Sequence, residues 1–492
     1  MTKKEKLIQR TLEILPGFVS WNLILFPYWG ILVMPNVVAY TILLFNLYWF
    51  YQSLNVAISA TVSHFRVQAS QKFDWAGELK AFPDCQKVHH FIIVPFVNEP
   101  LHILERTLDS LAAQTLDKKQ MTVVLATEAR VPDEQRLPKI NALKRKYSKS
   151  FANLFVTAHW LTPEEVRGKA SNERYAAIET KKEFIDKNKV DIDYAVVTSC
   201  DSDHKFHPNH FACLTYKFLD NPNRYKHFWQ PIVMFYNNIW ELPAITRVPN
   251  TLMSIWNLSL VPRKDRLINA QNYSLSFKLL HQAGYWDADK IPEDWGIFFK
   301  ALYETGGGIE VEPIYLPLLA DAAESDTLWK TLTNQYEQLK RWAYGASDIP
   351  WMIKFYFTKK GVNFWDKTTR LWYAMWSHFM WPVNWFLVTI GLTLPSILNP
   401  AFGRTALGYM VPKISSLVLT ISLLFLVITL FIDNVYKPPK PEKFSRMRKI
   451  LIPLEFILMP IAGFFFSALP GLDAHTRLML GKYIEYRVTE KV

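Results

Sequence analysis

Long apolar runs gather at the two ends of this 492-residue chain. They span residues 17–34, 36–57, 372–398, 414–432 and 450–470, and they are rich in Leu, Ile, Phe, Trp and Tyr. A helix of about 18 or more apolar residues can cross the roughly 30 Å hydrocarbon core of a bilayer. A helix buried in a soluble core is the alternative for any single run. Because all five runs lie near the ends, they favour membrane helices on either side of a soluble middle.

The basic residues at the start of the chain indicate how the N-terminus is oriented. Lys3, Lys4, Lys6 and Arg10 precede the first run, and the positive-inside rule then favours a cytoplasmic N-terminus. The uncharged link at 34–36 predicts a helical hairpin that returns the chain to the cytoplasm. We therefore expect an integral protein of a bacterial inner (plasma) membrane, with the middle of the chain in the cytoplasm.

Net charge and cysteine content narrow the classes of partner. The chain carries a net charge of +12, and a dense basic group between Lys437 and Lys449 lies between two apolar runs. Such a group is typical of a cytoplasmic loop that faces anionic lipid, so we expect no nucleic-acid partner. Three cysteines without a metal-ligand spacing (Cys85, Cys200 and Cys213) indicate free thiols in a reducing compartment.

Between the apolar ends, residues 88–345 have the pattern of one α/β domain. Short apolar runs alternate with segments of helical periodicity. The runs predict strands at 91–97, 121–127, 154–161 and 193–199, and the periodic segments predict helices at 101–111 and 171–187. This alternation predicts a largely parallel sheet with helices on its faces. Ligands of such sheets bind at the carboxyl ends of the strands.

Two aspartates follow the strand that ends at Cys200. Asp201 and Asp203 are two residues apart, so on an extended chain their carboxylates point the same way. Like charges placed in this way are costly unless a cation lies between them. Mg²⁺ and Mn²⁺ prefer oxygen ligands and commonly share them with substrate phosphates. A polar turn after a strand is the alternative, and the functional interpretation is a Mg²⁺ or Mn²⁺ site for a nucleotide diphosphate.

Three histidines follow the aspartates at three-residue spacing, at positions 204, 207 and 210. Pro208 interrupts a helix that would align them, and the spacing matches no standard zinc set. One of these histidines could still serve the cation or the phosphates of the predicted site.

Two further short motifs carry groups suited to sugar or phosphate chemistry. Glu293 and Asp294 precede a predicted helix at 297–303, where negative charge is stabilised by about 0.3–1 kcal/mol. A carboxylate at a cleft could instead accept a proton from an attacking hydroxyl. Gly168-Lys169-Ala170 precedes another helix, and Lys169 could reach a phosphate there, although the spacing of a P-loop is absent.

The stretch Gln338-Leu339-Lys340-Arg341-Trp342 lies just before the third apolar run. On a helix it presents an amide, a guanidinium and an indole. The indole offers a flat apolar face of the kind that sugars pack against, and the guanidinium can hold phosphate oxygens in a bidentate fork. An interfacial Trp with a snorkelling Arg is the alternative.

The order of these motifs resembles that of the membrane-embedded family 2 glycosyltransferases, which include cellulose, chitin and hyaluronan synthases and glucosylceramide synthase. The resemblance covers roughly residues 88–345 and extends to the flanking membrane helices. The matching stretches are Val94–Glu99 with Leu108–Gln114, Gly168–Ala170, Asp201–Asp203, Pro292–Asp294 (Thr-Glu-Asp in the family) and Gln338–Trp342 (Q-x-x-R-W). The resemblance implies an α/β fold in which a GT-A type nucleotide-sugar-binding domain is inserted between N- and C-terminal transmembrane helices.

The resemblance also implies a role for each matching position. The nucleotide would lie near Pro95, Glu99, Glu128, Lys169 and Asp201. Asp201 and Asp203 would hold the divalent cation, and Asp294 would be the general base with Glu293 beside it. The acceptor sugar and the diphosphate would be held by Gln338, Arg341 and Trp342. The implied reaction inverts the anomeric carbon of a nucleotide-diphospho-sugar, with UDP as the nucleotide.

Two positions depart from the family pattern. Glu128 stands where the family has Asp, which gives the carboxylate a longer reach toward the base or ribose. Pro292 replaces the Thr of Thr-Glu-Asp, which removes a hydroxyl and a backbone N–H. Neither change removes the predicted base or the predicted metal ligands.

The C-terminal residues 486–491 resemble the F-x-V-T-x-K gating loop of cellulose synthases, which is cytoplasmic and covers the nucleotide site. Five spans would place this tail on the outside. Either 450–470 is a re-entrant or interfacial segment, as Pro453, Pro460 and Pro470 permit, or the similarity of the tail is accidental.

The sequence predicts a division of the chain and leaves the acceptor open. The expected segments are a membrane hairpin (1–60), a linker (61–87), the glycosyltransferase domain (88–345), an interfacial segment (346–371), membrane helices (372–470) and a basic tail (471–492). Transfer to a polysaccharide is the leading interpretation, and transfer of one sugar to a lipid is the alternative. A non-catalytic membrane scaffold with a retained GT-A fold is the alternative from another class.

Overall fold

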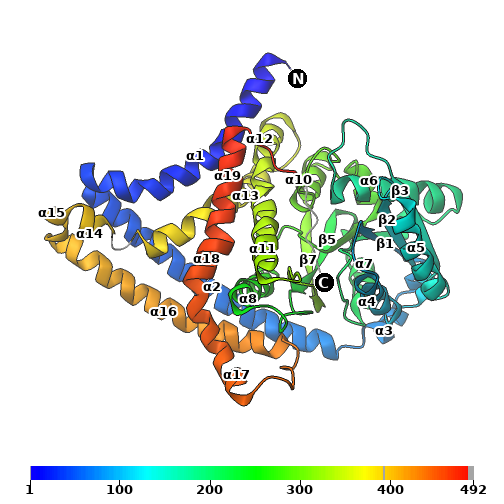
Figure 1. Ribbon diagram of the computed structural model, residues 1–492. Coiled ribbons are helices and arrows are strands. Elements are labelled where there is room, and N and C mark those ends of the chain that lie inside the picture. Colours follow the sequence, from blue (N-terminus) through cyan, green and yellow to red (C-terminus); the bar gives the residue numbers. More distant parts are fainter. Residues whose placement is uncertain (1, 392–393, 486–492) are drawn as a thin grey trace.

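The computed structural model describes residues 2–391 and 394–485. It has an α/β domain on one side and a group of long helices on the other (Figure 1). The N-terminal hairpin and the C-terminal helices come together beside the domain, although more than 250 residues separate them in the sequence.

The first two apolar runs form a helical hairpin. Helix α1 (Lys3–Val33) and helix α2 (Pro35–Lys72) are separated by Met34 alone. Pro35 opens α2, where the missing backbone N–H removes no helical hydrogen bond. The predicted hairpin is therefore present, and α2 continues well beyond its apolar part to reach the α/β domain.

The domain is built on one seven-stranded sheet, in which the strand order is β3-β2-β1-β4-β6-β5-β7. The strands are β1 (His89–Phe96), β2 (Met121–Glu128), β3 (Asn153–His159), β4 (Ala195–Ser199), β5 (His227–Met234), β6 (Tyr273–Ser276) and β7 (Glu310–Leu319). All pairs are parallel except those of β6, which is antiparallel to β4 and β5. The largely parallel α/β sheet expected from the sequence is confirmed, and all four predicted strands are present.

Helices cover both faces of the sheet. They are α3 (Trp75–Glu78), α4 (Leu101–Ala112), α5 (Asp133–Tyr147), α6 (Lys169–Thr180), α7 (His210–Asp220), α8 (Ala244–Leu260), α9 (Phe277–Gln282) and α10 (Asp294–Glu304). The sheet separates two hydrophobic cores, one on each face. Residues of β1 contribute to them alternately, because successive side chains of a strand point to opposite faces. Ile92 packs with α4, α5 and α7, and Phe91 packs with α6, α9 and α10.

The described residues of the C-terminal part form helices joined by loops. The helices are α11 (Leu328–Ala343), α12 (Ile349–Thr358), α13 (Phe364–Thr389), α14 (Leu394–Leu398), α15 (Pro400–Gly403), α16 (Ala406–Tyr436), α17 (Arg446–Leu451), α18 (Met459–Gly463) and α19 (Leu469–Leu480). Short 3-10 and π-helical turns join α17, α18 and α19 into one helical run.

Four helices of the described chain are long and apolar enough to cross a membrane: α1, α2, α16 and the run Arg446–Leu480. Helix α13, which contains most of the run 372–398, is not among these four. Helices α1, α2, α13 and α16 approach one another near α14 and α15, at the end of the molecule far from the sheet (Figure 1). The run α17–α19 instead lies across them.

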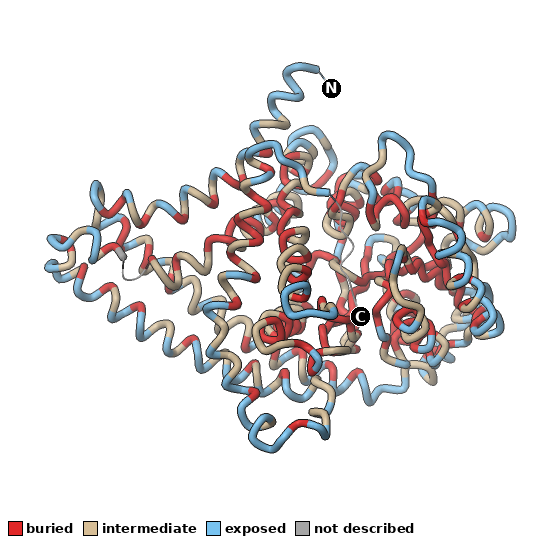
Figure 2. Tube along the Cα trace, viewed as in Figure 1, coloured by how far each residue is buried: buried red, intermediate tan, exposed pale blue. Residues whose placement is uncertain are grey.

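Burial differs sharply between the two parts of the molecule (Figure 2). The sheet is buried, whereas the long helices expose large apolar side chains such as Leu44, Leu424 and Phe431. A large exposed apolar surface of this kind marks an interaction site, and on helices of this length it fits association with a membrane.

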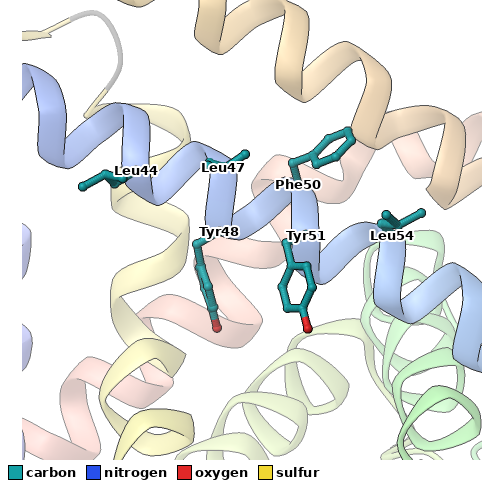
Figure 3. A pocket seen from close by; sticks show the side chains of 6 residues that line it. All are labelled: Leu44, Leu47, Tyr48, Phe50, Tyr51 and Leu54. Carbon is teal, nitrogen blue, oxygen red and sulfur yellow. The ribbon is translucent and has the colours of Figure 1, made fainter.

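An apolar groove of about 480 Å³ follows one stretch of α2, and it is lined by Leu44, Leu47, Tyr48, Phe50, Tyr51 and Leu54 (Figure 3). Tyr48 and Tyr51 point to one side of α2, while Phe50 packs on Phe425 of α16. The Tyr48 hydroxyl accepts a hydrogen bond from Trp376 Nε1 at 2.8 Å, which joins α2 to α13.

A substitution of Ile92, which lies in the middle of β1, tests whether the core beside the sheet stabilises the fold. The side chain of Ile92 is fully buried, and truncation to alanine leaves a cavity that costs about 2–5 kcal/mol. We expect Ile92→Ala to lower the thermal unfolding midpoint of the detergent-solubilised protein by at least about 4 °C. The matched control is Leu137→Ala, because Leu137 is 42% exposed on α5. Equal midpoints for the two variants would contradict the assigned core.

Candidate active site

Polar side chains gather beyond the carboxyl ends of β1, β2 and β4, where the sequence places the candidate motifs. Strand β4 ends at Ser199 and runs directly into Asp201-Ser202-Asp203. Ser199 is paired with Tyr273 of β6, so the loop before β6 lies next to the two aspartates. The start of α10 is tied to the same loop, because Asn269 Nδ2 donates to the backbone oxygen of Asp294 at 2.8 Å.

Asp201, Asp203 and His204 form a group of possible metal ligands, with one ligand atom from each lying within 4.8 Å of the others. Asp203 is almost completely buried, and its Oδ2 accepts a hydrogen bond from Asp321 N at 2.9 Å. His204 Nε2 is 3.7 Å from Asp201 Oδ2. Two carboxylates and an imidazole are suitable donors for Mn²⁺ or Mg²⁺, so the residues present fit the cation expected from the sequence.

The other two histidines of the sequence motif do not join this group. His210 is buried between Phe206 and Phe211, with ring centroids 4.8 and 4.9 Å away. His207 lies in the loop before α7, where its Nδ1 accepts a hydrogen bond from Asn209 N at 3.2 Å. Of the three histidines, His204 is the one that lies in the group with Asp201 and Asp203.

Lys169, the first residue of α6, lies at the centre of a cluster of carboxylates. Its Nζ is 2.9 Å from Asp201 Oδ1, 3.1 Å from Glu293 Oε1 and 3.9 Å from Glu173 Oε1. The same ammonium group lies 3.3 Å from the backbone oxygen of Gln271. Lys169 therefore connects three motifs that are far apart in the sequence.

Glu173 is one turn further along α6 and is fully buried. Its Oε1 accepts a hydrogen bond from Ser199 Oγ at 2.7 Å, and its Oε2 has no hydrogen-bond partner among the described residues. Burial raises the pKa of Glu173 to about 8, although the charge of Lys169 opposes the shift. Burial alone would lower the pKa of Lys169, but Asp201, Glu173 and Glu293 outweigh it and raise that pKa well above its usual value.

Asp294 is the first residue of α10, directly after Glu293 at the N-cap. Its Oδ2 accepts a hydrogen bond from Gln271 N at 2.7 Å. Gln271 has a positive φ of 66°, an uncommon conformation for a residue other than glycine. This conformation lets one residue donate its N–H to Asp294 and turn its carbonyl toward Lys169. Because strained backbone clusters at functional sites, the geometry supports a site at this loop.

The carboxyl group of Asp294 is poised to exchange a proton near neutral pH. Burial raises its pKa to about 7, the charge of Glu293 adds to the shift, and Lys169 opposes it. The Oδ1 atom is buried without a hydrogen-bond partner among the described residues. A general base works best when its pKa lies near the working pH, so Asp294 has the properties that this role requires.

The residues predicted for the nucleotide lie along the same edge of the sheet. Pro95 is the penultimate residue of β1, and Glu128 is the buried last residue of β2. Glu128 is in an ion pair with Arg130 two residues later, so its carboxylate is already oriented by a cation. Glu99 lies in the loop after β1, where its Oε2 accepts a hydrogen bond from Val97 N at 2.6 Å.

Gln338, Arg341 and Trp342 share one face of α11, because residues three and four apart are neighbours on a helix. Gln338 is buried, and Trp342 is half-buried with its ring 5.8 Å from that of Phe235. Helix α11 lies between the sheet and the long helices, and it packs against α19. The expected platform thus lies where the domain meets the membrane-type helices.

Sequence reasoning did not identify Glu173, Asp321, Arg106 or Gln271. Arg106 of α4 pairs with Asp321 at 2.5 Å, and Asp321 in turn binds Asp203 through its backbone N–H. Glu173 could have been found from its position four residues after Lys169, which places both on one face of a helix. The tail 486–491, expected to act as a gating segment, lies outside the described residues.

Three solved structures are similar to this chain at the level of the fold. The mannosyltransferase PcManGT from Pyrobaculum calidifontis, in complex with GDP-Man and Mn²⁺, aligns with 80% of this chain and 99% of its own at 12% identity and a TM-score of 0.46. S. aureus TarS 1–349 in complex with UDP-GlcNAc covers 81% of this chain and 93% of its own, at 12% identity and a TM-score of 0.34. GalNAc-T7 with UDP, GalNAc and Mn²⁺ covers 59% of this chain and 58% of its own, at 13% identity and a TM-score of 0.37.

Comparisons at the sequence level give no match. No protein-family model matches the chain, and no curated protein matches it. The structural similarities are too low to transfer substrates or residue roles, so the chemistry of the site has to be argued from its own geometry.

The metal site can be tested without any assay of activity. Asn in place of Asp203 keeps the size and removes one charged oxygen ligand, so Asp203→Asn should weaken Mn²⁺ binding in the presence of UDP at least about tenfold. Electron paramagnetic resonance of free Mn²⁺ measures the affinity directly. The control is Asp220→Asn, because Asp220 is exposed at the end of α7. If Asp203→Asn and the control bind Mn²⁺ equally well, the assignment is wrong.

Proposed function

We propose that this chain is a membrane-associated, metal-dependent, inverting glycosyltransferase with a GT-A type domain. It would transfer a hexose from a nucleotide-diphospho-sugar, with UDP as the nucleotide, to an acceptor at the membrane. The observation that carries the proposal is the cluster at the strand ends. There Lys169 binds both Asp201 and Glu293, and Asp294, with its raised pKa, is the next residue.

The donor would bind at the carboxyl edge of β1, β2 and β4. Glu99 and Glu128 lie beside the expected place of the nucleoside, and Asp201 and Asp203 with His204 would hold Mg²⁺ or Mn²⁺. When bound, this cation supplies neutralising charge for the diphosphate. Lys169 Nζ is 2.9 Å from Asp201 Oδ1, and a diphosphate would offer Lys169 an alternative anionic partner.

Asp294 would act as the general base. The acceptor hydroxyl attacks the anomeric carbon, its proton moves to a carboxylate oxygen of Asp294, and a new C–O bond forms. On the opposite face the bond between the anomeric carbon and the phosphate oxygen breaks, and the electron pair leaves with the nucleoside diphosphate. Gln271 N holds Asp294 Oδ2 in place, which leaves the buried Oδ1 to take the proton.

Helix α11 supports an acceptor site at the membrane side of the domain. We propose that Gln338 and Trp342 hold the acceptor sugar and that Arg341 stabilises the departing diphosphate, because a guanidinium binds phosphate oxygens in a bidentate fork. The leading acceptor is a growing polysaccharide. Transfer of one sugar to a lipid uses the same site and is the alternative, since α11 packs directly against α19.

Removal of the proposed base gives the sharpest test of the mechanism. Asp294→Asn keeps the shape and the hydrogen bond from Gln271 N but cannot accept a proton. We expect kcat to fall by about 10²–10⁴-fold, the usual contribution of a general base, while the Kd for UDP changes less than about threefold. Nucleotide release and UDP binding measure the two quantities on the same preparation.

Asp220→Asn is the matched control for this experiment, because it removes a carboxylate from the surface. Full turnover by Asp294→Asn would contradict the base assignment. The non-catalytic scaffold would be favoured if the wild-type protein folds and binds UDP normally but transfers no sugar with any donor or acceptor tested.

The raised pKa of Asp294 predicts the pH profile. Only the ionised carboxylate accepts a proton, so kcat/KM should rise about tenfold per pH unit below pH about 7 and level off above it. A carboxyl group with its usual pKa would instead give a flat profile down to about pH 5. A flat profile between pH 5 and 8 would therefore contradict this role for Asp294.

The size of the labelled product distinguishes the two acceptors. Membranes that contain the protein, a radiolabelled UDP-sugar and Mn²⁺ should yield a ladder of chain lengths if the acceptor is a polysaccharide. A single product that extracts into organic solvent would instead assign transfer to a lipid.

A further inference from the structure

The helical run Arg446–Leu480 is long and apolar enough to cross a membrane, yet its packing is incompatible with a crossing. One end contacts the α/β domain, and the other contacts α11, the helix whose Trp342 packs against the core of that domain. Near the first end, Arg247 of α8 binds Glu455 through two contacts of 2.6 and 2.7 Å. Near the second end, Lys340 Nζ of α11 is 3.5 Å from Asp473 Oδ2. A helix whose two ends are held in this way remains on the domain side of the bilayer.

The contacts at the first end are extensive and buried. Arg247 is 4% exposed, and its Nε also donates to the backbone oxygen of Ile239 at 3.0 Å. Just before the run, Trp240 Nε1 donates to the backbone oxygen of Pro438 at 2.8 Å. Removing one partner of a buried ion pair is strongly destabilising, so this end is held firmly to the domain.

The contacts at the second end are equally specific. Arg10 of α1 donates to the backbone oxygen of Leu478 at 2.8 Å, and Trp21 Nε1 donates to Thr476 Oγ1 at 3.0 Å. The orientation of the run across α1, α2, α13 and α16 agrees with these contacts (Figure 1).

One face of the first half of this run is apolar and exposed. Its members are Met447, Ile450, Leu451, Leu454, Ile457, Ile461 and Phe465. They recur at intervals of three or four residues apart from the adjacent pair 450 and 451, and therefore form one stripe along the helix. The opposite side packs on the protein, where Ile452, Ala462 and Phe466 are buried. We name the seven exposed residues the apolar stripe.

A basic group adjoins the start of the apolar stripe. It consists of Lys440, Lys443, Arg446, Arg448 and Lys449. Within residues 2–391 and 394–485, none of these five side chains is in an ion pair with a carboxylate. A helix with an exposed apolar face and basic residues at one end matches the surface of a membrane that contains anionic lipid.

We propose that the run Arg446–Leu480 lies in the plane of the membrane surface, with the apolar stripe in the acyl region and the basic group on anionic lipid headgroups. The C-terminus is then on the same side of the membrane as the α/β domain. This inference goes beyond sugar transfer and holds whether or not the chain is a glycosyltransferase.

Depth measurements distinguish an in-plane run from a crossing one. Residues 450 and 465 are about 22 Å apart along a helix, which is most of the hydrocarbon thickness. Fluorescent probes are attached to Ile450→Cys, Ile457→Cys and Phe465→Cys in a Cys85→Ser background, and the full-length protein is placed in nanodiscs. Lipids brominated at different acyl positions then report the depth of each probe.

The three probes should be quenched at the same shallow depth. The matched control is α16, where Leu417→Cys, Leu424→Cys and Phe431→Cys should differ in depth from one to the next. If the depth in the run 446–480 changes progressively, as in α16, the in-plane position is wrong.

The preference for anionic lipid is measured separately with a probe at Met447→Cys. Brominated phosphatidylglycerol should quench this probe roughly twofold more than brominated phosphatidylcholine at equal mole fraction. The preference should be abolished in a variant that combines Lys443→Gln, Arg446→Gln, Arg448→Gln and Lys449→Gln. An unchanged depth of the probe at 457 in this variant would show that the run is still folded. A variant with Gln at Lys118 and Lys119, which precede β2, and at Lys144 and Arg145, in the last turn of α5, should leave the preference unchanged. Equal quenching by the two lipids in the unsubstituted protein would overturn the assignment of the basic group.

Discussion

The candidate site depends on one largely buried ammonium group placed among carboxylates, of which Glu173 is fully buried. Asp201, Glu173 and Glu293 all approach Lys169 Nζ, and Asp294 and Asp203 are close by. Buried charges carry a desolvation cost of several kcal/mol each unless they are paired. Burial is the main cause of the raised pKa of Asp294 and Glu173. One lysine cannot neutralise five acidic groups, so the negative charge that remains adds to this shift and favours a divalent cation.

The same cluster explains why distant parts of the fold must meet at the end of β4. Helix α6 supplies Lys169 and Glu173, the loop after β4 supplies Asp201, and the start of α10 supplies Glu293. Gln271 connects these elements through its backbone, because its N–H binds Asp294 and its carbonyl faces Lys169. A shift of any one element would separate Lys169 from one of its carboxylate partners.

The position of the domain relative to the long helices adds a second constraint. Helix α11 has the domain core on one side and α19 on the other, and Lys340 links the two helices through Asp473. A product formed at this helix would therefore arise beside the membrane surface. This arrangement suits either a chain that leaves through the membrane or a lipid that approaches along it.

Sequence reasoning recovered the four strands 91–97, 121–127, 154–161 and 193–199, because they are apolar runs bounded by polar turns. It missed β5, β6 and β7, and β6 has only four residues, with no pattern that marks it as a strand.

Asp201, Asp203 and Lys169 were predicted from local motifs. Gln271 was not, since its role depends on a backbone conformation. Sequence reasoning left 450–470 open between a membrane span and a re-entrant or interfacial segment, because the orientation of the run 446–480 depends on contacts such as Arg247 with Glu455.

Diffraction from crystals grown with UDP and Mn²⁺, recorded at the manganese absorption edge, tests the central claim most directly. The predicted result is an anomalous peak between Asp201 and Asp203, with the diphosphate beside it and Lys169 Nζ displaced from Asp201 toward a phosphate oxygen. The Lys169 contacts with Glu173 and Glu293 should persist, because these residues are not metal ligands in the proposed site. Bound UDP with an unchanged Lys169–Asp201 contact and no manganese at the two aspartates would contradict the assignment of this cluster as the catalytic centre.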